Sequence, residues 1–391
     1  MNPRRRLYTL AERLPAPVLR TLKRLPGAWR IRARLAGKPQ ATGPGAGELR
    51  PVVYLPTWAR WDQMRQRPQY LLAAFAKAGH EVYFIDPRER QPRMADGVDL
   101  VPDLEHVPGH NVILYVHFAP VSSMFQLFDD PVIVYDILDD LSIYDADEDG
   151  IPAERRVAHF HPDVVLNADV VSVSSESLAE QHRRERPDLI VVPNGVEPER
   201  FTKPQPRPDD LPDGVMPLIG YHGAVAPWFD FDLYAATAEL LPDCQFVLVG
   251  PIDPRASERA GRLAALPNVI ILGERPSDLI PWYVQRFDVG TIPFVVDPMT
   301  RGVSPLKMYE YLAAGKPCVA TPLPACVAEA IVRTAPDAPQ FAAAVREALG
   351  DATDQAYAAE VRASAAAASW DRRVAVIRRR LDDIGLLRWE P

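Results

Sequence analysis

The sequence contains no apolar run long enough to cross a bilayer, and it contains few cysteines. Its three cysteines, Cys244, Cys318 and Cys326, have no metal-ligand spacing with histidines, and their odd number argues against a disulfide framework. The arginine-rich N-terminal stretch also lacks the apolar core and the small-residue cleavage site of a secretory signal. These absences argue against a membrane-spanning protein and a disulfide scaffold, and they predict a protein of the reducing cytoplasm.

The chain has 391 residues, 47% of them hydrophobic and 25% charged, which is the composition of a globular protein with two domains. Its net charge of -8 is uneven, because residues 1–40 hold eleven Lys or Arg and the single acid Glu12. Apolar residues recur there at near-helical spacing, which suits a helix on anionic lipid at the inner face of the cell membrane. The alternative is a helix packed on the protein itself or a disordered basic tail, since prolines interrupt the pattern. The acidic remainder predicts no nucleic-acid partner.

Strand-like apolar runs alternate with helical stretches along the rest of the chain, which predicts the α/β class with two doubly wound, Rossmann-like domains. The runs lie at 51–56, 81–86, 111–117, 132–136 and 170–174 in the first half, and at 217–221, 245–250, 269–273, 289–293 and 318–321 in the second. The proline-rich segment 201–216 is expected to be the hinge, and a last helix over 371–384 is expected to cross back. The predicted parts are a basic extension and linker (1–47), an acceptor domain (48–205), a donor domain (216–369) and a crossover helix (370–391).

The most informative motif is the run from Thr300 to Pro317, SPLKMYEYLAAGKP at its centre. Ser304 is a suitable N-cap and Pro305 suits the first helical position, whereas Gly315 suits a C-cap and Pro317 prevents continuation. These signals predict a helix over residues 305–314.

The amino end of this predicted helix has the chemistry of an anion site. Exposed backbone N–H groups and the helix dipole favour a phosphate, and Gly302 lets the backbone approach it, with Val303 and Ser304 in the same turn. Arg301 and Lys307 add fixed positive charge. Glu310 follows on the face of Lys307, where a carboxylate can accept two hydrogen bonds from the vicinal diol of a ribose. The alternative is that Lys307 and Glu310 form a surface pair on an ordinary helix.

This motif resembles the donor-binding signature of the GT-B glycosyltransferases, in particular the large retaining family with two glutamates eight positions apart. The resemblance extends over roughly residues 50 to 385 and implies two facing domains with the active site in the cleft. It implies that Glu310, which matches the second glutamate, binds the nucleotide ribose. The first glutamate falls on Gly302, so the stereochemical outcome stays open.

Weaker matches occur in the expected order along the second half. Residues 219–224, including His222 and Gly223, are similar to the strand and loop that open the donor domain. Residues 268–283 are similar to the segment that ends in a base-contacting loop, which makes Arg275 a candidate donor contact. A tight turn and a plain loop are the alternatives.

On the acceptor side, Trp58, Trp61 and Arg67 follow the first strand, where the first loop of such a sheet faces the crevice. Aromatic and arginine side chains there can stack on a sugar and hold phosphate. Arg67 is the best candidate because a similar run occurs in the branch that resembles teichuronic acid biosynthesis proteins. His117 ends the next strand but one and is a candidate proton shuttle, although a lone histidine is more often structural.

Three aspartates, Asp136, Asp139 and Asp140, follow a further strand, and one of them is expected to orient the acceptor hydroxyl or to act as base. Asp139 and Asp140 are the catalytic candidates together with His117. Acidic triplets such as Asp145-Ala-Asp147 do not follow a clear apolar strand, so no metal is predicted, and no cofactor is expected besides the nucleotide-sugar substrate.

The predicted function is transfer of a hexose-like sugar from a nucleoside diphosphate sugar to a hydroxyl of a cell-surface glycan, a lipid-linked intermediate or a small molecule. The resemblance favours retention of configuration. A sugar-nucleotide epimerase of the same fold is one alternative, and a catalytically degenerate nucleotide-binding subunit is another, because the acid expected at Gly302 is missing.

Overall fold

The computed structural model describes residues 39, 41, 43–57, 59–62, 65–140 and 153–390. The predicted lipid-binding helix within residues 1–38, the acidic triplet at 145–147 and Trp58 lie outside these residues, so the membrane contact stays a prediction. The chain forms two compact units, which we describe separately. Unit 1 comprises Met1–Ser174, Leu178–Val192 and Val374–Pro391, and unit 2 comprises Ser175–Ser177 and Pro193–Arg373.

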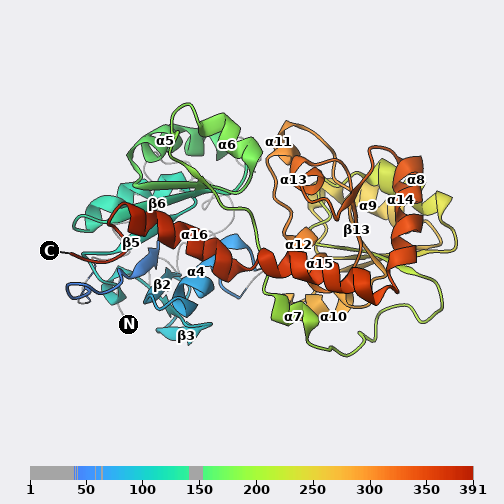
Figure 1. Cartoon of the computed structure of the whole chain (residues 1–391), viewed down its shortest axis with the longest axis horizontal. Coiled ribbons are helices and arrows are strands. Elements are labelled where there is room, and N and C mark those ends of the chain that lie inside the picture. Colours follow the sequence, from blue (N-terminus) through green and yellow to red (C-terminus); the bar gives the residue numbers. More distant parts are fainter. Residues whose placement is uncertain are drawn as a thin grey trace, which may run out of the picture. The chain divides into compact units, whose positions relative to one another are not determined.

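Unit 1 contains a sheet of eight strands among its described residues, in the order β3-β4-β2-β1-β5-β6-β7-β8 (Figure 1). Every neighbouring pair is parallel except β3 and β4. The strands are β1 (Val52–Tyr54), β2 (Val82–Ile85), β3 (Arg93–Ala95), β4 (Val98–Val101), β5 (Ile113–Val116), β6 (Val132–Ile137), β7 (Val170–Val173) and β8 (Ile190–Val191). Its principal helices are α4 (Arg67–Lys77), α5 (Ala153–Asn167), α6 (Glu176–His182) and the 3-10 helix η2 (Ala119–Leu127).

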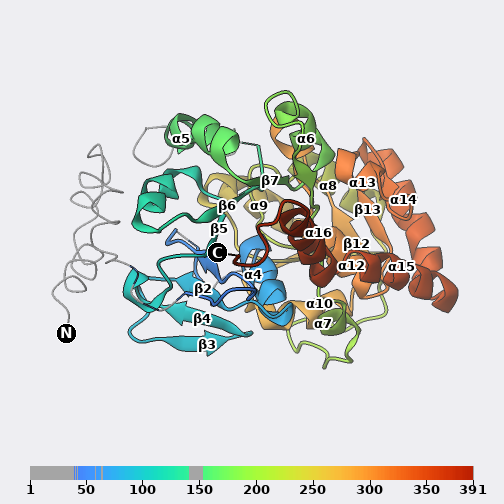
Figure 2. The same ribbon diagram turned by 60° about the vertical axis from the view of Figure 1, so that its left-hand side comes forward.

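Unit 2 contains a parallel sheet of six strands among its described residues, in the order β11-β10-β9-β12-β13-β14. The strands are β9 (Leu218–His222), β10 (Gln245–Val249), β11 (Val269–Gly273), β12 (Val289–Ile292), β13 (Cys318–Ala320) and β14 (Arg333–Thr334). Helices cover both of its faces, as Figure 2 shows. They are α7 (Pro198–Thr202), α8 (Phe231–Leu240), α9 (Ser257–Ala264), α10 (Ile280–Val284), α11 (Pro298–Arg301), α12 (Leu306–Ala313), α13 (Pro324–Val327), α14 (Ala338–Asp351) and α15 (Gln355–Ala367).

The last helix, α16 (Trp370–Asp383), returns the chain to unit 1 from Val374 onward, as the sequence predicts. The predicted hinge at 201–216 does not coincide with the observed boundary between the units, because unit 2 already begins at Pro193. Phe201 and Leu211 are buried in the core of unit 2, and the Gln285 side chain donates to the carbonyl of Phe201 at 2.8 Å. Segment 201–216 is therefore packed on unit 2.

Helix α12 packs on the sheet of unit 2 through the ring of Tyr311. A Cβ on Gly290 of β12 would lie 2.3 Å from the Tyr311 ring, so only glycine leaves room for this side chain. The Tyr311 hydroxyl lies 3.3 Å from the carbonyl of Thr291 and accepts from the backbone N–H of His222 at 3.2 Å. This contact fixes the helix against the ends of β9 and β12.

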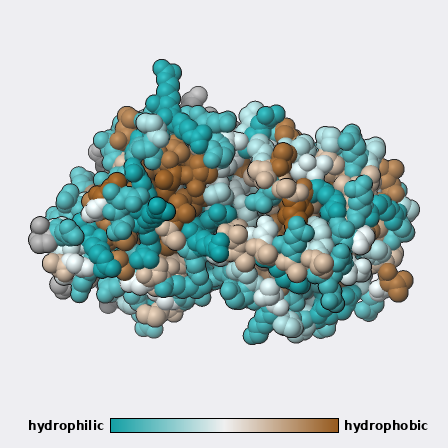
Figure 3. Space-filling view, viewed as in Figure 1, coloured by the Kyte–Doolittle hydropathy of each residue, from teal (hydrophilic) through white to brown (hydrophobic). Residues whose placement is uncertain are grey.

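Apolar side chains fill the interior of both units, and the view in Figure 3 is mainly hydrophilic with smaller groups of exposed apolar residues. None of the helices in the described part of the chain is long and apolar enough to cross a membrane.

Candidate functional site

The strand order reverses direction between β9 and β12 in unit 2, and ligands of such sheets bind at the carboxyl ends of the strands at this point. His222 and Gly223 stand at the carboxyl end of β9, and Phe294 follows β12. Gly223 has a φ of +119°, which residues with a side chain rarely adopt, so the turn requires glycine at this position. The candidate site is built around these residues.

Helix α12 begins next to this point, one residue later than predicted. Pro305 is its N-cap, no side chain caps it, and the first helical residue is Leu306. At the other end, Gly315 has a φ of +75°, its N–H donates to Leu312, and Lys316 donates to Tyr311. These bonds form a Schellman motif, so the predicted role of Gly315 in ending the helix is confirmed.

The turn before α12 is held by contacts with residues far away in the sequence. The hydroxyl of Ser304 accepts from the backbone N–H of Asn194 at 3.1 Å, which corrects its predicted role as the helix N-cap. The carbonyl of Gly302 accepts from the Ser175 hydroxyl at 2.8 Å. The turn is thus fixed before any ligand binds.

The other two residues predicted in this turn differ in exposure. Arg301 is exposed at the end of α11, and Val303 is half-buried. The structure therefore leaves Arg301 accessible to solvent beside the amino end of α12.

The ammonium group of Lys307 lies over two aromatic rings. Its Nζ is 5.2 Å from the centroid of Tyr221 and 4.5 Å from that of Phe294, and the side chain rests against Gly223. Burial lowers the pKa of Lys307 to about 8, although the nearby Glu310 opposes this shift. Within the described residues no carboxylate lies within ion-pairing distance of Lys307, so the predicted alternative of a surface pair with Glu310 is not observed.

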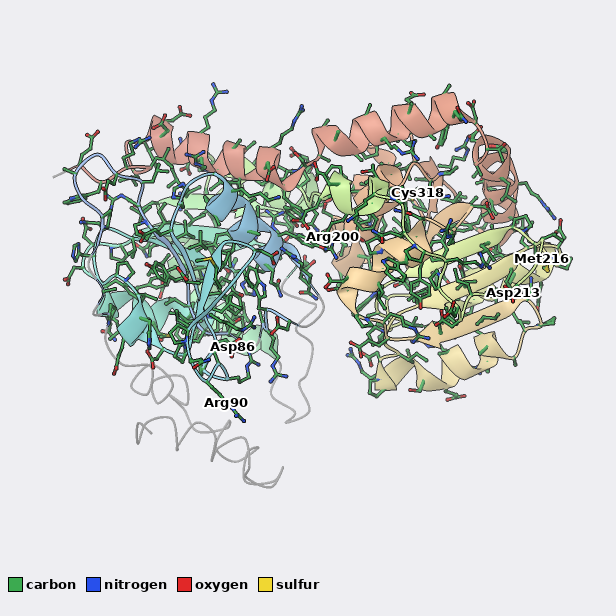
Figure 4. The ribbon with its side chains drawn as sticks, turned by 90° about the horizontal axis from the view of Figure 1, so that it is seen from below. Asp86, Arg90, Arg200, Asp213, Met216 and Cys318 are labelled. Carbon is green, nitrogen blue, oxygen red and sulfur yellow. The ribbon has the colours of Figure 1, made fainter. Side chains whose placement is uncertain are left out.

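Glu310 is buried, with 9% of its surface exposed, and faces His222 instead of solvent. Its Oε2 lies 3.1 Å from His222 Nε2, without the alignment of a full hydrogen bond. Burial would raise the pKa of Glu310, but His222, Arg200 and Lys307 together lower it below the usual value. Arg200, labelled in Figure 4, comes from α7. The carboxylate is therefore ionised and able to accept further hydrogen bonds.

Arg275 is engaged within unit 2. Its Nη2 donates to Asp210 Oδ2 at 2.6 Å, and its Nε donates to the Tyr283 hydroxyl at 3.1 Å. This pair ties the loop after β11 to segment 201–216. A donor contact by Arg275 would require Asp210 to release it.

In unit 1 the predicted acceptor arginine is part of the core. Arg67 is 3% exposed, and it donates to Asp136 Oδ2 at 2.8 Å and to Oδ1 at 2.9 Å. Asp136 is fully buried and also accepts from Ser172 at 2.6 Å and from Tyr115. Burial would raise the pKa of Asp136, but Arg67 lowers it. This corrects the prediction that Arg67 holds a phosphate, because its guanidinium fork is occupied, and it removes Asp136 as a candidate base.

His117 and Trp61 are also enclosed. His117 is 6% exposed, its Nδ1 lies 2.8 Å from the Tyr54 hydroxyl, and burial lowers its pKa to about 4. It is therefore neutral near pH 7. Trp61 is 8% exposed and packs edge-on against Phe84 at 5.4 Å, so stacking of this ring on a sugar does not fit its burial.

The two remaining aspartates differ from each other. Asp140 accepts from the Gln181 side chain at 2.9 Å. Asp139 is half-buried and has no hydrogen-bond or ion-pair partner in the described part of the chain. Burial raises its pKa to about 6, with Arg67 opposing the shift. An unpartnered carboxylate with a raised pKa at the carboxyl end of β6 has the properties of a base.

The sequence did not identify several residues that contact the site residues in the fold but are mostly distant from them in the sequence. They are the ring pair Tyr221 and Phe294, the carboxylate Asp210, and the turn-holding residues Ser175 and Asn194. Tyr221 lies in the segment 219–224 and Asp210 in the predicted hinge, so the sequence singled out both segments. The contacts that these residues make with Lys307 and Arg275 are not encoded in a local pattern.

Residues 217–351 match the family model described as glycosyl transferases group 1. A stretch of 169 residues is 33% identical to a putative teichuronic acid biosynthesis glycosyltransferase, TuaH, of Bacillus subtilis (strain 168). This match covers 41% of the chain and 42% of that protein, so less than half of the relative's length is represented.

Two solved structures resemble the chain over most of its length. Sucrose-phosphate synthase from Thermosynechococcus elongatus has a TM-score of 0.66 and 16% identity, covering 86% of this chain and 99% of the other. The Anabaena protein HepE, in complex with UDP and glucose, has a TM-score of 0.62 and 16% identity, covering 86% and 100%. The predicted resemblance and the predicted two-domain parallel-sheet fold are thereby confirmed.

Proposed function

We propose that this chain is a GT-B glycosyltransferase that transfers a hexose from a nucleoside diphosphate sugar to a hydroxyl group, and the match of residues 217–351 to the glycosyl transferases group 1 model supports this proposal. The single observation that carries this proposal is the ammonium of Lys307, which lies beside the strand-order reversal of unit 2 and has no carboxylate partner among the described residues. A buried cation in such a place is stabilised when a diphosphate binds.

Unit 2 holds the donor in this proposal. Lys307, Arg301 and the N–H groups at the start of α12 bind the diphosphate, and their positive charge stabilises the leaving group without requiring a metal ion. Glu310 accepts hydrogen bonds from the ribose hydroxyls, and His222 keeps its carboxylate ionised. UDP with glucose is the donor chemistry that the complex of HepE suggests for this chain.

The acceptor hydroxyl attacks the anomeric carbon as the bond from this carbon to the phosphate oxygen breaks. In the retaining version of the reaction, the hydroxyl proton passes to the departing phosphate oxygen, so the absence of an acid at Gly302 is no obstacle. In unit 1, the ionised carboxylate of Asp139 accepts a hydrogen bond from a second hydroxyl group of the acceptor and so orients the acceptor. A cell-surface glycan or its lipid-linked intermediate is the proposed acceptor class, because the curated relative is named for teichuronic acid biosynthesis.

The replacement Lys307→Met tests the proposal with a matched control, Lys203→Met, which removes an exposed lysine of the same unit. Loss of a charge that stabilises the leaving group lowers turnover by about 10²- to 10³-fold, whereas the control retains full turnover. Sugar transfer from UDP-glucose to a panel of glycan acceptors measures both, and binding of UDP is followed by its thermal shift.

Equal turnover in the two variants would remove Lys307 from the reaction. Incubation with donor alone separates the rival functions: conversion to a new sugar nucleotide selects an epimerase, and tight UDP binding with no turnover selects a degenerate binding subunit.

A further inference from the structure

Asn194 holds the residue before the N-cap of α12 through both its main chain and its side chain. Its backbone N–H donates to the Ser304 hydroxyl at 3.1 Å, and its Nδ2 donates to the Ser304 carbonyl at 2.5 Å. Ser304 is 3% exposed, so water has little access to these two bonds. The two hydrogen bonds therefore fix both the side chain and the backbone of Ser304 in one position.

The Ser304 hydroxyl is thereby kept away from the end of α12. Serine is well suited to cap a helix, because its hydroxyl accepts from the N–H groups of the first turn. Here the hydroxyl bonds instead to Asn194 and to the Tyr309 side chain. Burial raises the pKa of Tyr309, whereas Arg373 and the hydrogen bond with Ser304 oppose this shift. The hydroxyl is thus occupied on both sides.

The first turn of α12 is left open as a result. No side chain caps the helix, and within the described residues the N–H groups of Leu306 and Lys307 have no hydrogen-bond partner. Free N–H groups at the amino end of a helix bind phosphate oxygens, and the helix dipole favours the negative charge. The bonds made by Asn194 therefore preserve the groups that a diphosphate needs.

Asn194 is itself held firmly within unit 2. The Arg373 Nε donates to the Asn194 carbonyl at 3.1 Å, and the Val196 N–H donates to the Ala368 carbonyl at 3.1 Å. A Cβ on Gly195 would lie 2.6 Å from the Ala368 carbonyl oxygen, so only glycine allows this close approach. Asn194 is thus anchored on the far side from Ser304 and can serve as a rigid support.

We propose that Asn194 is a positioning residue of the donor site, which holds Ser304 so that the amino end of α12 stays open to the diphosphate. This inference rests on the proposed function. Asn194 does not touch the donor and acts only through Ser304. Without its side chain, the turn before α12 can move and the Ser304 hydroxyl can approach the first-turn N–H groups. The diphosphate then loses well-aligned hydrogen bonds, whereas the nucleoside keeps its own contacts.

The test is a calorimetric titration of the full chain with UDP, GDP, ADP and dTDP, followed by titration with the nucleoside of the diphosphate that binds. Asn194→Ala is expected to weaken diphosphate binding by about fivefold to tenfold, because charge-assisted hydrogen bonds to phosphate are misaligned. Its affinity for the nucleoside, measured by saturation-transfer NMR, is expected to stay at the parental value. This split between the two ligands is the readout that a general loss of structure would not produce.

Asn268→Ala is the matched control for a structural asparagine. Asn268 is buried in the same unit, and its Nδ2 donates to the carbonyls of Ala238, Leu241 and Cys244 at 2.9, 3.1 and 3.1 Å. Its replacement is expected to lower the midpoint of thermal unfolding, because these carbonyls lose their donor, while the affinity for the diphosphate stays parental. Asn194→Ala is expected to show the opposite balance, with a larger loss of affinity than of stability.

Two results would overturn the positioning role of Asn194. One is parental affinity of Asn194→Ala for the diphosphate, and the other is equal weakening of diphosphate and nucleoside binding. Lys307→Met, measured in parallel, separates this failure from failure of the proposed function. If Lys307→Met weakens binding and Asn194→Ala does not, only the positioning role is lost. If no diphosphate binds the parental chain, or if neither variant changes its binding, the donor site itself is rejected.

A second variant keeps the test decisive if Asn194→Ala does not fold. Arg373→Met leaves the Asn194 side chain in place and removes the donor to its carbonyl. It is expected to weaken diphosphate binding by a smaller factor, about threefold, and to leave nucleoside binding unchanged. Parental diphosphate affinity in Arg373→Met would then overturn the proposal.

Discussion

Each unit has a mostly buried cationic side chain next to its sheet, Arg67 in unit 1 and Lys307 in unit 2. The two side chains differ in whether a carboxylate pairs with them. In unit 1, Arg67 is closed into a buried ion pair with Asp136, and two hydroxyls complete the partners of this carboxylate. In unit 2, Lys307 rests on two aromatic rings and has no carboxylate partner among the described residues. The first arrangement satisfies the charge within the fold, and the second leaves it available to a ligand.

This difference indicates which charged group in each unit is available for binding or catalysis. Buried charges are costly without partners, so a group that remains unpartnered in an otherwise satisfied interior marks a functional position. At the carboxyl edge of the unit 1 sheet, Asp139 has no partner within the part of the chain that the structure describes, and its pKa is raised to about 6. In unit 2 it is the base Lys307, and its pKa is lowered to about 8.

The largest expected effect comes from opening the ion pair of unit 1. Arg67→Met leaves Asp136 buried and unpaired, which is expected to cost about 3 to 5 kcal/mol of local stability. Hydrogen exchange of the β6 amides measures this loss, because a chain of two units need not unfold in a single step.

Arg346→Met is the matched control in unit 2. It removes an exposed ion pair with Asp243, which is expected to contribute little to stability because solvent screens the two charges. Equal exchange in both variants would contradict the structural role of Arg67 and return it to the candidate phosphate contacts.

The second effect concerns Asp139, which is expected to be ionised during the reaction. Activity should rise as pH increases through about 6, the raised pKa of this carboxyl, and Asp139→Asn should remove this limb and lower turnover by about 10²-fold. Asp140→Asn is the neighbouring control and should keep the rate and the limb, with the limb moved to lower pH because the charge of Asp140 helps to raise the pKa of Asp139. A limb that survives in Asp139→Asn would assign it to the donor phosphate instead.

The same carboxyl has a predicted effect on stability of opposite sign. Its folded pKa of about 6 lies above the ordinary value, so the folded state holds the proton more tightly and loses stability as pH rises from about 4 to 6. Asp139→Asn removes this loss, and it should raise the unfolding midpoint at pH 7.5 while leaving the midpoint near pH 4 unchanged. A lower midpoint at pH 7.5 would show that ionised Asp139 is stabilised by the fold.

The regular elements could be predicted because apolar periodicity is local. The runs at 132–136 and 269–273 became β6 and β11 within a residue, and the helix expected at 371–384 became α16. The hairpin of β3 and β4 was missed, although Asp96 and Gly97 at its turn are a common hairpin signal and have φ values of +52° and +78°. Its first strand is short and polar, so periodicity gave no indication of it.

Site residues that depend on local sequence patterns could also be predicted, whereas roles that depend on partners distant in the sequence could not. Lys307 and Glu310 were found because they share one helix, and Gly315 ends this helix as its sequence position predicts. The roles of Arg67 and Ser304 were wrong, because their partners Asp136 and Asn194 lie 69 and 110 residues away. Which charges are satisfied within the fold depends on such pairings, and a single sequence does not contain them in readable form.

The smallest expected effect concerns the ion pair of Asp210 and Arg275. This pair is intermediate between the buried ion pair of Arg67 and the Lys307 side chain, which is unpaired within the described residues, because the pair is formed but partly exposed. Its side chains are 36% and 27% exposed, so the pair is expected to contribute about 1 kcal/mol or less. Asp210→Asn weakens the hold on the guanidinium, while the Tyr283 hydroxyl still accepts from Arg275 Nε. If Arg275 is a donor contact, its release should tighten UDP binding by about two- to fivefold in a calorimetric titration. Binding weakened by more than about tenfold would instead mean that the ion pair positions the loop after β11, and Arg275 would then belong with Arg67 among the charges that the fold itself consumes.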